Sequence, residues 1–304
     1  MVASRHDFHA LGSDCAVHLV ADSAAEFARL AKAAEAEVVR IERRFSRYRL
    51  DSELSRINAA AAAGGSVRID DETAGLIAFA KACFDRSNGA FDITSGVLRA
   101  AWDFSTARLP EQAAIDALLP RIGLDKVTLA EGCVHFARAG MELDFGGLGK
   151  EYAADRAAEV CIALGARHGF VDLAGDIRVI GPQPDGAAWR VGVRHPRNPQ
   201  LVIAQVAMCG GALATSGDYE RFIEVEGERY GHILDPRSGW PARGLSSVTV
   251  ISERCLVAGS LATTAMLKGC EGADWLRRLG VRHIVAADDG CCYGTEPIEL
   301  RRYS

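Results

Sequence analysis

The strongest constraint on the fold is a change of pattern near Gly169. Before this residue, apolar side chains recur at spacings of three and four, as they do from Phe27 to Phe45, which is typical of amphipathic helices. After it, short apolar segments bounded by turn residues follow one another, which is typical of strands. Because long helices occur together with many consecutive strands, we predict an α+β fold with mixed, largely antiparallel sheets and packed helices.

Capping signals and periodicity place the individual elements. Ser23 and Glu26 form a capping-box pattern that opens the first long helix, and Asn88 and Gly89 end a second helix that starts near Asp71. Small residues suggest turns at AAAAAGGS and at 215–217, and a helix start at AGSLATTAMLKG (258–269). A further helix is predicted at 150–164. The predicted strands are 15–21, 126–130, 133–137, 142–145, 170–173, 177–180, 189–194, 202–207, 222–225, 247–251 and 283–287.

Composition narrows the class of protein. The 304 residues suit one large domain or two intimate subdomains, and we predict a single domain over 1–304. The net charge of −5 argues against a general nucleic-acid binder, which needs a basic face. No segment approaches the ~18 apolar residues of a membrane span. The nine cysteines are scattered without a CxxC pair, so we expect free thiols.

Glycine-rich stretches carry the candidate chemistry. In GAFDITSG, Asp92 stands between turn-forming glycines, where an N-cap or Asx-turn role is favoured over a direct functional one. In ELDFGGLGKEYAAD (142–155), glycines precede Lys150 at a predicted helix start, so this stretch is either a structural turn or a cradle for a phosphate. In GGALATSGDYERF, the turn at 215–217 offers hydroxyls and N–H groups, and a plain β-turn is as well supported as a site.

The stretch YGHILDPRSGWPA contains the histidine most suited to chemistry. His232 lies at a predicted strand end beside Asp235 and a turn fixed by Pro236 and Gly239. It is either structural or a general base that takes a proton from a hydroxyl. The chain has neither a GxSxG nucleophile elbow nor an HExxH zinc motif, so a serine hydrolase and a zinc protease are unsupported.

Taken together, these stretches resemble the ApbE family of FAD:protein FMN transferases. The resemblance runs nearly end to end, through GSDCAVHL, FSRYRLDSELSRIN, GAFDITSG, LDFGGLGKEYAAD, VDLAGDIRVIG, ATSGDYERF, HILDPRSGWP and AGSLATTAMLKG. It implies that one FAD lies in a cleft between two subdomains. It further implies that, with the help of Mg²⁺, the FAD pyrophosphate is split, AMP leaves, and FMN is attached through a phosphoester to a Ser or Thr of an acceptor flavoprotein.

The resemblance also implies roles for individual residues. His232 would be the base that acts on the acceptor hydroxyl. The carbonyl of Gly147 and the hydroxyl of Thr263 would be metal ligands. The residues that would contact the flavin nucleotide are Tyr48, Ala90, Phe91, Asp92, Asp144, Lys150 and Ile233.

The chain departs from the family pattern mildly in the start motif, where Leu11-Gly12-Ser13 replaces the usual Met-Gly-Thr, and further at two positions. The pattern Ala-Asp-x-x-x-Thr, in which the Asp is a metal carboxylate, reads AGSLAT here and ends at Thr263, so the acid is replaced by Gly259. The usual Lys-Gly after the glycine turn reads Lys150-Glu151. Because Mg²⁺ usually takes one or two carboxylates, its presence is in doubt. Water could fill the gap, or another acid could reach in, with Asp176 and Asp218 as candidates.

A third outcome is that the protein binds FAD without turning it over. A non-catalytic FAD-binding protein and an FAD pyrophosphatase therefore stay open beside the transferase. The lipoprotein signal found in many family members is not visible, so we expect a cytoplasmic protein with no membrane anchor. The predicted partner is an acceptor flavoprotein, and no nucleic acid is expected.

Overall fold

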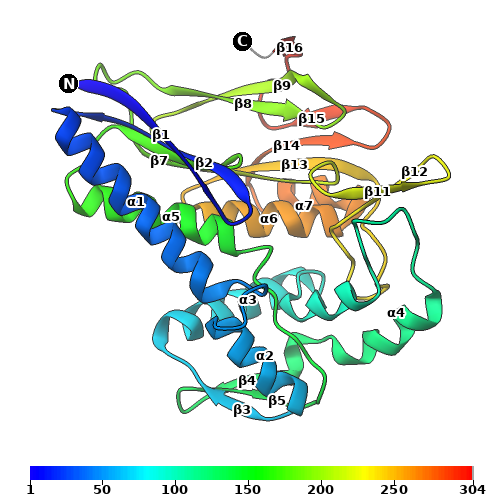
Figure 1. Ribbon diagram of the computed structural model, residues 1–304. Coiled ribbons are helices and arrows are strands. Elements are labelled where there is room, and N and C mark those ends of the chain that lie inside the picture. Colours follow the sequence, from blue (N-terminus) through cyan, green and yellow to red (C-terminus); the bar gives the residue numbers. More distant parts are fainter. Residues whose placement is uncertain (303–304) are drawn as a thin grey trace.

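A computed structural model describes residues 1–302 and has an eight-stranded sheet at its centre, in which all neighbouring strands run antiparallel (Figure 1). This sheet, with the helices around it, confirms the predicted α+β class. In spatial order its strands are β1 (Val2–Ala10), β2 (Ser13–Ala21), β6 (Gly169–Leu173), β7 (Asp176–Gly181), β10 (Gly211–Gly217), β13 (Leu245–Ser252), β14 (Arg282–Ala287) and β15 (Cys292–Gly294).

Both faces of this sheet are covered. A small sheet of β8 (Trp189–His195), β9 (Asn198–Met208) and β16 (Arg301–Arg302) lies on one face. On the other face lie the helices α1 (Ala24–Phe45), α5 (Gly149–Ala163), α6 (Cys255–Leu267) and α7 (Gly272–Arg278) (Figure 1). Successive side chains of a strand point to opposite faces, so Val250 packs among the helices and Ile251 packs against the small sheet. This double cover explains why β13 is buried almost throughout, including two of its serines and its threonine.

A second region lies at the other end of α1 (Figure 1). It contains α2 (Glu53–Ala63), α3 (Asp71–Ser87), α4 (Gln112–Leu118), the sheet β3 (Ser66–Arg68), β5 (Cys133–Phe136) and β4 (Val127–Ala130), and the 3₁₀ helices η1 (Ile93–Ala100), η2 (Leu119–Arg121) and η3 (Leu124–Lys126). The hairpin β11 (Phe222–Val225) and β12 (Glu228–Gly231) and the 3₁₀ helix η4 (Gly269–Glu271) complete the fold. One buried apolar cluster contains Val17 of β2, Ile77 of α3 and Val134 of β5, so the two regions share a core. The single domain and the cleft between subdomains stay predictions.

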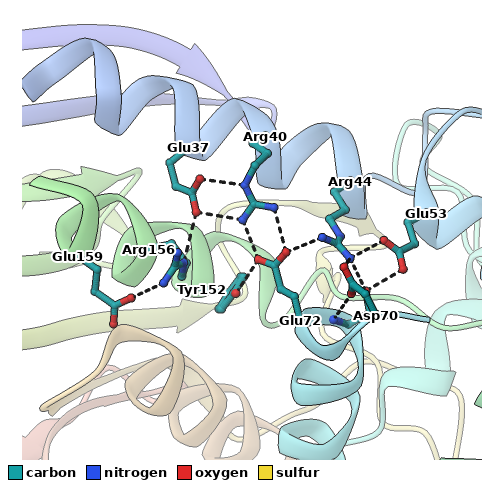
Figure 2. A network of polar contacts seen from close by, with 10 residues as sticks. Glu37, Arg40, Arg44, Glu53, Asp70, Glu72, Tyr152, Arg156 and Glu159 are labelled. Atoms are coloured by element: carbon teal, nitrogen blue, oxygen red, sulfur yellow. Dashed lines mark hydrogen bonds and ion pairs between the residues drawn. The ribbon is translucent and has the colours of Figure 1, made fainter. Parts of the chain in front are cut away.

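An ion-pair network joins four helices between the two regions (Figure 2). Arg44 of α1 contacts Glu53 of α2 at 2.7 Å, Glu72 of α3 at 2.6 Å, and the carboxylate of Asp70, which caps α3. On α5, the Tyr152 hydroxyl donates to Glu72 at 2.7 Å. The Arg44 side chain is only 19% exposed, because these carboxylates surround it.

The segment 142–145 is not a strand, and that prediction is wrong. Asn58 of α2 takes the place of a neighbouring strand: its side-chain amide donates to the Leu143 carbonyl at 2.9 Å and accepts from the Leu143 N–H at 2.8 Å. The Asp144 N–H donates to the Ile93 carbonyl at 2.8 Å. The segment therefore has the apolar pattern of a strand but no neighbouring strand, because Asn58 and Ile93 form hydrogen bonds with its backbone N–H and carbonyl groups.

Three turn or helix-start predictions are also wrong. The alanines of AAAAAGGS are the last residues of α2, which Gly64 ends in a left-handed conformation. Residues 215–217 are the end of strand β10. The helix α6 begins at Cys255, so Gly259 lies within it. Within residues 1–302, no helix combines the length and the apolarity needed to cross a membrane.

Candidate functional site

Arg47 joins two residues that the resemblance assigns to the flavin nucleotide. One guanidinium nitrogen pairs with the Asp144 carboxylate, and another donates to the Tyr48 hydroxyl at 2.8 Å. Asp144 also accepts from the Gly146 N–H at 2.8 Å, which fixes its carboxylate at the start of the glycine turn. Gly96 permits this position, because a Cβ there would lie 2.7 Å from that of Asp144. The only sequence signal of Arg47 is its place beside Tyr48.

The residues of GAFD are buried beneath the glycine turn. Ala90, Phe91 and Asp92 are all buried, and a Cβ on Gly147 would lie 3.7 Å from the Phe91 ring. Asp92 caps η1: its carboxylate accepts from the Thr94 N–H at 2.7 Å and from the Thr94 hydroxyl at 2.6 Å. This confirms the predicted N-cap. Burial raises the pKa of Asp92 against these hydrogen bonds, and contact of this residue with a flavin stays a prediction.

His232 has one ring nitrogen held by the backbone and one free. Its Nδ1 lies 3.0 Å from the carbonyl oxygen of Arg221. A carbonyl can only accept, so Nδ1 carries the proton and Nε2 keeps a lone pair. The side chain is exposed, yet desolvation by surrounding protein, together with the charges of Arg221 and Lys150, lowers the pKa of His232 below 6.5. The neighbouring Ile233 is half-buried, and its carbonyl accepts from Ala242 at 2.8 Å.

Lys150 and two buried acids form a second cluster at the start of α5. The Lys150 ammonium lies 3.0 Å from the carboxylate of Asp176, whose side chain is 3% exposed. Desolvation opposes the charge of Lys150, but Asp176 and Glu151 outweigh it and raise its pKa, so Lys150 is a permanent cation. Burial, with the nearby charge of Asp176, raises the pKa of Glu151 to about 8. The motif thus places Lys150 and Glu151 at the start of α5, and the fold brings Asp176 of β7 to the same place.

Thr263 lies on α6 with its hydroxyl 2.8 Å from that of Ser216 on β10. Gly259 precedes it by one helical turn, on the same face. The space beside Gly259 holds an acid from another helix: a Cβ on Gly259 would lie 2.5 Å from Oε1 of Glu151. Of the two acids predicted to reach in, Asp218 is bound by both terminal nitrogens of Arg197, at 2.5 and 2.7 Å, and Asp176 is paired with Lys150.

Electrostatic effects connect these groups into one neighbourhood. Partial desolvation alone would raise the pKa of Tyr48, but Arg47 and Arg221 lower it. Arg221 also supplies the carbonyl that holds His232, and Lys150 contributes to lowering the pKa of that histidine. Arg47 thus connects Tyr48 with Asp144, and Arg221 acts on both Tyr48 and His232.

No group of three or more His, Cys, Asp or Glu side chains is arranged to hold a metal ion anywhere in residues 1–302. The donors near Gly259 are instead one carboxylate and hydroxyls. Oε2 of Glu151 is buried without a hydrogen-bond partner. Hard divalent cations prefer oxygen ligands of these kinds, so an orphaned carboxylate oxygen on the face of α6 that carries Thr263 fits Mg²⁺ once substrate phosphates supply further oxygens.

A surface hollow of about 830 Å³ lies elsewhere. It is open to solvent and lined by Leu50, Asp51, Ser52, Glu53, Arg56, Arg68, Ile69 and Asp70. It contains none of the residues assigned above to FAD, metal or base, and its acids Glu53 and Asp70 belong to the ion-pair network of Arg44. The chemistry therefore points to the His232 neighbourhood and not to this hollow.

Comparisons with known proteins agree along the whole chain. The model of the ApbE family matches residues 11–285. A Rhodobacter capsulatus protein named FAD:protein FMN transferase is 34% identical over 258 residues, which are 82% of this chain and 49% of that protein, so the chain spans about half of its length. A Vibrio cholerae protein of the same name is 30% identical over 254 residues, 81% of this chain and 76% of that protein.

A solved structure shows the same fold. The crystal structure of the ApbE protein from Thermotoga maritima superposes with a TM-score of 0.89 at 32% identity and covers 97% of each chain. The likeness therefore extends over both regions of the molecule and over every motif described above.

Proposed function

The chain belongs to the ApbE family, and from this premise we propose that it transfers FMN from FAD to a Ser or Thr hydroxyl of an acceptor protein, releasing AMP. The acceptor hydroxyl attacks the phosphorus of the FMN half, the pyrophosphate bond to AMP breaks, and the hydroxyl loses its proton. The observation that carries the proposal is the state of His232. Its free Nε2, on a neutral and exposed imidazole, is what a general base for that proton needs.

The other groups supply positioning and charge. Phosphoryl transfer depends on alignment and on neutralising negative charge more than on covalent work by the protein. Lys150 remains a cation next to His232 and can hold a phosphate oxygen. Arg47 orients Tyr48 and Asp144, which we assign with Ala90, Phe91, Asp92 and Ile233 to the flavin nucleotide.

The expected cation fits the oxygen donors described above. The Gly147 carbonyl and the Thr263 hydroxyl, with FAD phosphates, would hold Mg²⁺. When bound, Mg²⁺ would neutralise charge on the pyrophosphate. The carboxylate of Glu151 beside Gly259 weakens the case for a protein that only binds FAD, since that case rested on a missing acid.

The test is incubation of the purified protein with FAD, Mg²⁺ and a panel of flavoprotein domains that expose a Ser or Thr. Acceptor mass is read by mass spectrometry and AMP by chromatography. Transfer predicts a gain of one FMN mass with an equal amount of AMP. The variant His232→Ala should keep FAD affinity and lose about 10²–10⁴-fold in rate. Bound FAD without adduct or AMP would mean binding alone, and AMP with free FMN would mean pyrophosphatase activity.

A further inference from the structure

Two departures from the family pattern, far apart in the sequence, meet in the structure. Residue 259 has lost the expected acid and residue 151 has gained one. The helices α5 and α6 pack against each other, and a Cβ on Gly259 would lie 2.5 Å from Oε1 and 2.8 Å from Cδ of Glu151. An acidic side chain at 259 would start from the place that the Glu151 carboxylate now occupies. With these two changes the acid comes from α5 instead of α6, while the carboxylate stays in the same place between the two helices.

The Glu151 carboxylate lacks the partners that a buried acid needs. The residue is only 6% exposed, and its Oε2 has no hydrogen-bond partner. The adjacent cation, Lys150, is paired with Asp176 at 3.0 Å. Burying an unpartnered carboxylate is costly, and native proteins resolve that cost with a hydrogen bond, a counter-charge or a metal ion. Unless a further positive group is present, the acid must take up a proton to avoid this cost, in agreement with its raised pKa.

Oxygen donors lie on the same side. Thr263 follows Gly259 by four residues, so both are on the face of α6 that meets Glu151. The Thr263 hydroxyl is 2.8 Å from that of Ser216, which brings a second hydroxyl from β10. A carboxylate and hydroxyls form a set of oxygen donors that suits a hard divalent cation.

We propose that Glu151, from α5, is the carboxylate ligand of a divalent cation between α5 and α6, in place of the acid missing at residue 259. The inference rests on the proposed function, because FAD phosphates would complete the coordination. Glycine at residue 259 is then required by Glu151, because any larger side chain at 259 would clash with the Glu151 side chain in its present position.

The test measures metal binding directly. Mn²⁺ replaces Mg²⁺, since the two ions share ligand preferences, and free Mn²⁺ is counted by electron paramagnetic resonance with FAD present. We expect Glu151→Gln to weaken Mn²⁺ binding at least tenfold. The matched control is Glu159→Gln, which removes the same charge from the same helix at a residue paired with Arg156 and Arg254; it should bind Mn²⁺ like the wild type.

A double variant moves the acid back. In Glu151→Gly with Gly259→Asp, the carboxylate comes from α6 again, and Mn²⁺ affinity should return to within about threefold of the wild type. This variant decides the matter even if Glu151→Gln fails to fold, as judged by circular dichroism. Equal Mn²⁺ affinity in wild type and Glu151→Gln, or no Mn²⁺ binding by a folded double variant, would overturn the inference.

Flavin fluorescence in the same samples separates the two proposals. Wild-type protein that binds FAD but no Mn²⁺ would overturn this inference and leave flavin binding intact. Wild-type protein that binds no FAD would overturn the proposed function and, with it, this inference.

Discussion

At the residue scale, the candidate site depends on pairs in which one side chain fixes another. Arg47 is the clearest example, because a single guanidinium holds the Asp144 carboxylate and the Tyr48 hydroxyl. The Arg221 carbonyl plays the same part for His232 by fixing its tautomer. These positioning groups decide what the predicted contact residues can do.

Replacing Arg47 should weaken FAD binding. In Arg47→Ala, Asp144 loses its counter-charge and Tyr48 loses a hydrogen bond, and hydrogen bonds to charged groups contribute about 1.5–3 kcal/mol. We expect the Kd for FAD, measured by flavin fluorescence, to rise at least about tenfold. The control is Arg49→Ala in the same motif, which breaks only an exposed pair with Asp51. A Kd for Arg47→Ala within twofold of the wild type would contradict the assigned role.

The state of His232 sets the pH dependence of transfer. The base must be neutral, and desolvation places its pKa below 6.5. The rate of AMP release should therefore be constant at pH values well above the lowered pKa of His232 and fall as the pH drops through that pKa. Rates measured at saturating FAD and acceptor between pH 5 and 8 test this fall in rate at low pH. The pH dependence should be absent from the residual rate of His232→Ala. A fall in rate centred above pH 7 would be incompatible with this assignment.

At the element scale, an isolated extended segment carries Asp144 between two helices. The segment 142–145 has no neighbouring strand, and the Asn58 amide of α2 binds both backbone groups of Leu143. A helix side chain therefore sets the position of the glycine turn. We expect the Asn58 amide to contribute both to the stability of the fold and to the placement of Asp144.

The variant Asn58→Ala tests this coupling. It leaves the N–H and carbonyl of the buried Leu143 without their partners, which should lower the free energy of unfolding by about 2 kcal/mol. Urea denaturation measures the loss, and FAD affinity should fall with it because Asp144 follows Leu143. Asn198→Ala, at an exposed strand end, is the control. A change below about 0.5 kcal/mol in Asn58→Ala would show that the segment is held by other contacts.

At the scale of the whole molecule, two regions share one core and one ion-pair network. The apolar cluster runs from β2 to β5, and the Arg44 network ties α1, α2, α3 and α5 together (Figure 2). Neither region buries its apolar surface without the other, so the two should unfold together.

We therefore expect a single unfolding transition. Tryptophan fluorescence reports on both regions, since Trp102 packs near α4 and Trp189 lies on β8, while far-UV circular dichroism reports on all helices. The two signals should share one urea midpoint. Arg44→Met, which leaves three carboxylates without their common cation, should lower that midpoint without separating the signals. Two resolved midpoints would contradict a single domain over 1–304.

The fold class and many elements could be predicted from local pattern. Periodicity and capping predict α1, α3 and α5 to within a few residues, and the apolar segments after Gly169 predict most of the strands. The Asp92 N-cap follows from one residue and its neighbours. Such features are decided by groups close together along the chain, so the sequence displays them directly.

Features that depend on distant partners could not be predicted in this way. The segment 142–145 has a strand pattern but meets the side chain of Asn58 instead of a strand, and residues 215–217 have a turn composition but pair with β13. Arg47 and Arg221 enter the site only because folding brings them beside Asp144 and His232.

The sequence by itself determined the class of fold, the family resemblance and the loss of an acid at residue 259. Only the tertiary structure decided what that loss means, because it placed Glu151 of α5 in the space beside Gly259 of α6. The physical reason is that two side chains cannot occupy one volume. A local pattern records which residues are present, while packing between helices decides which of them share a site.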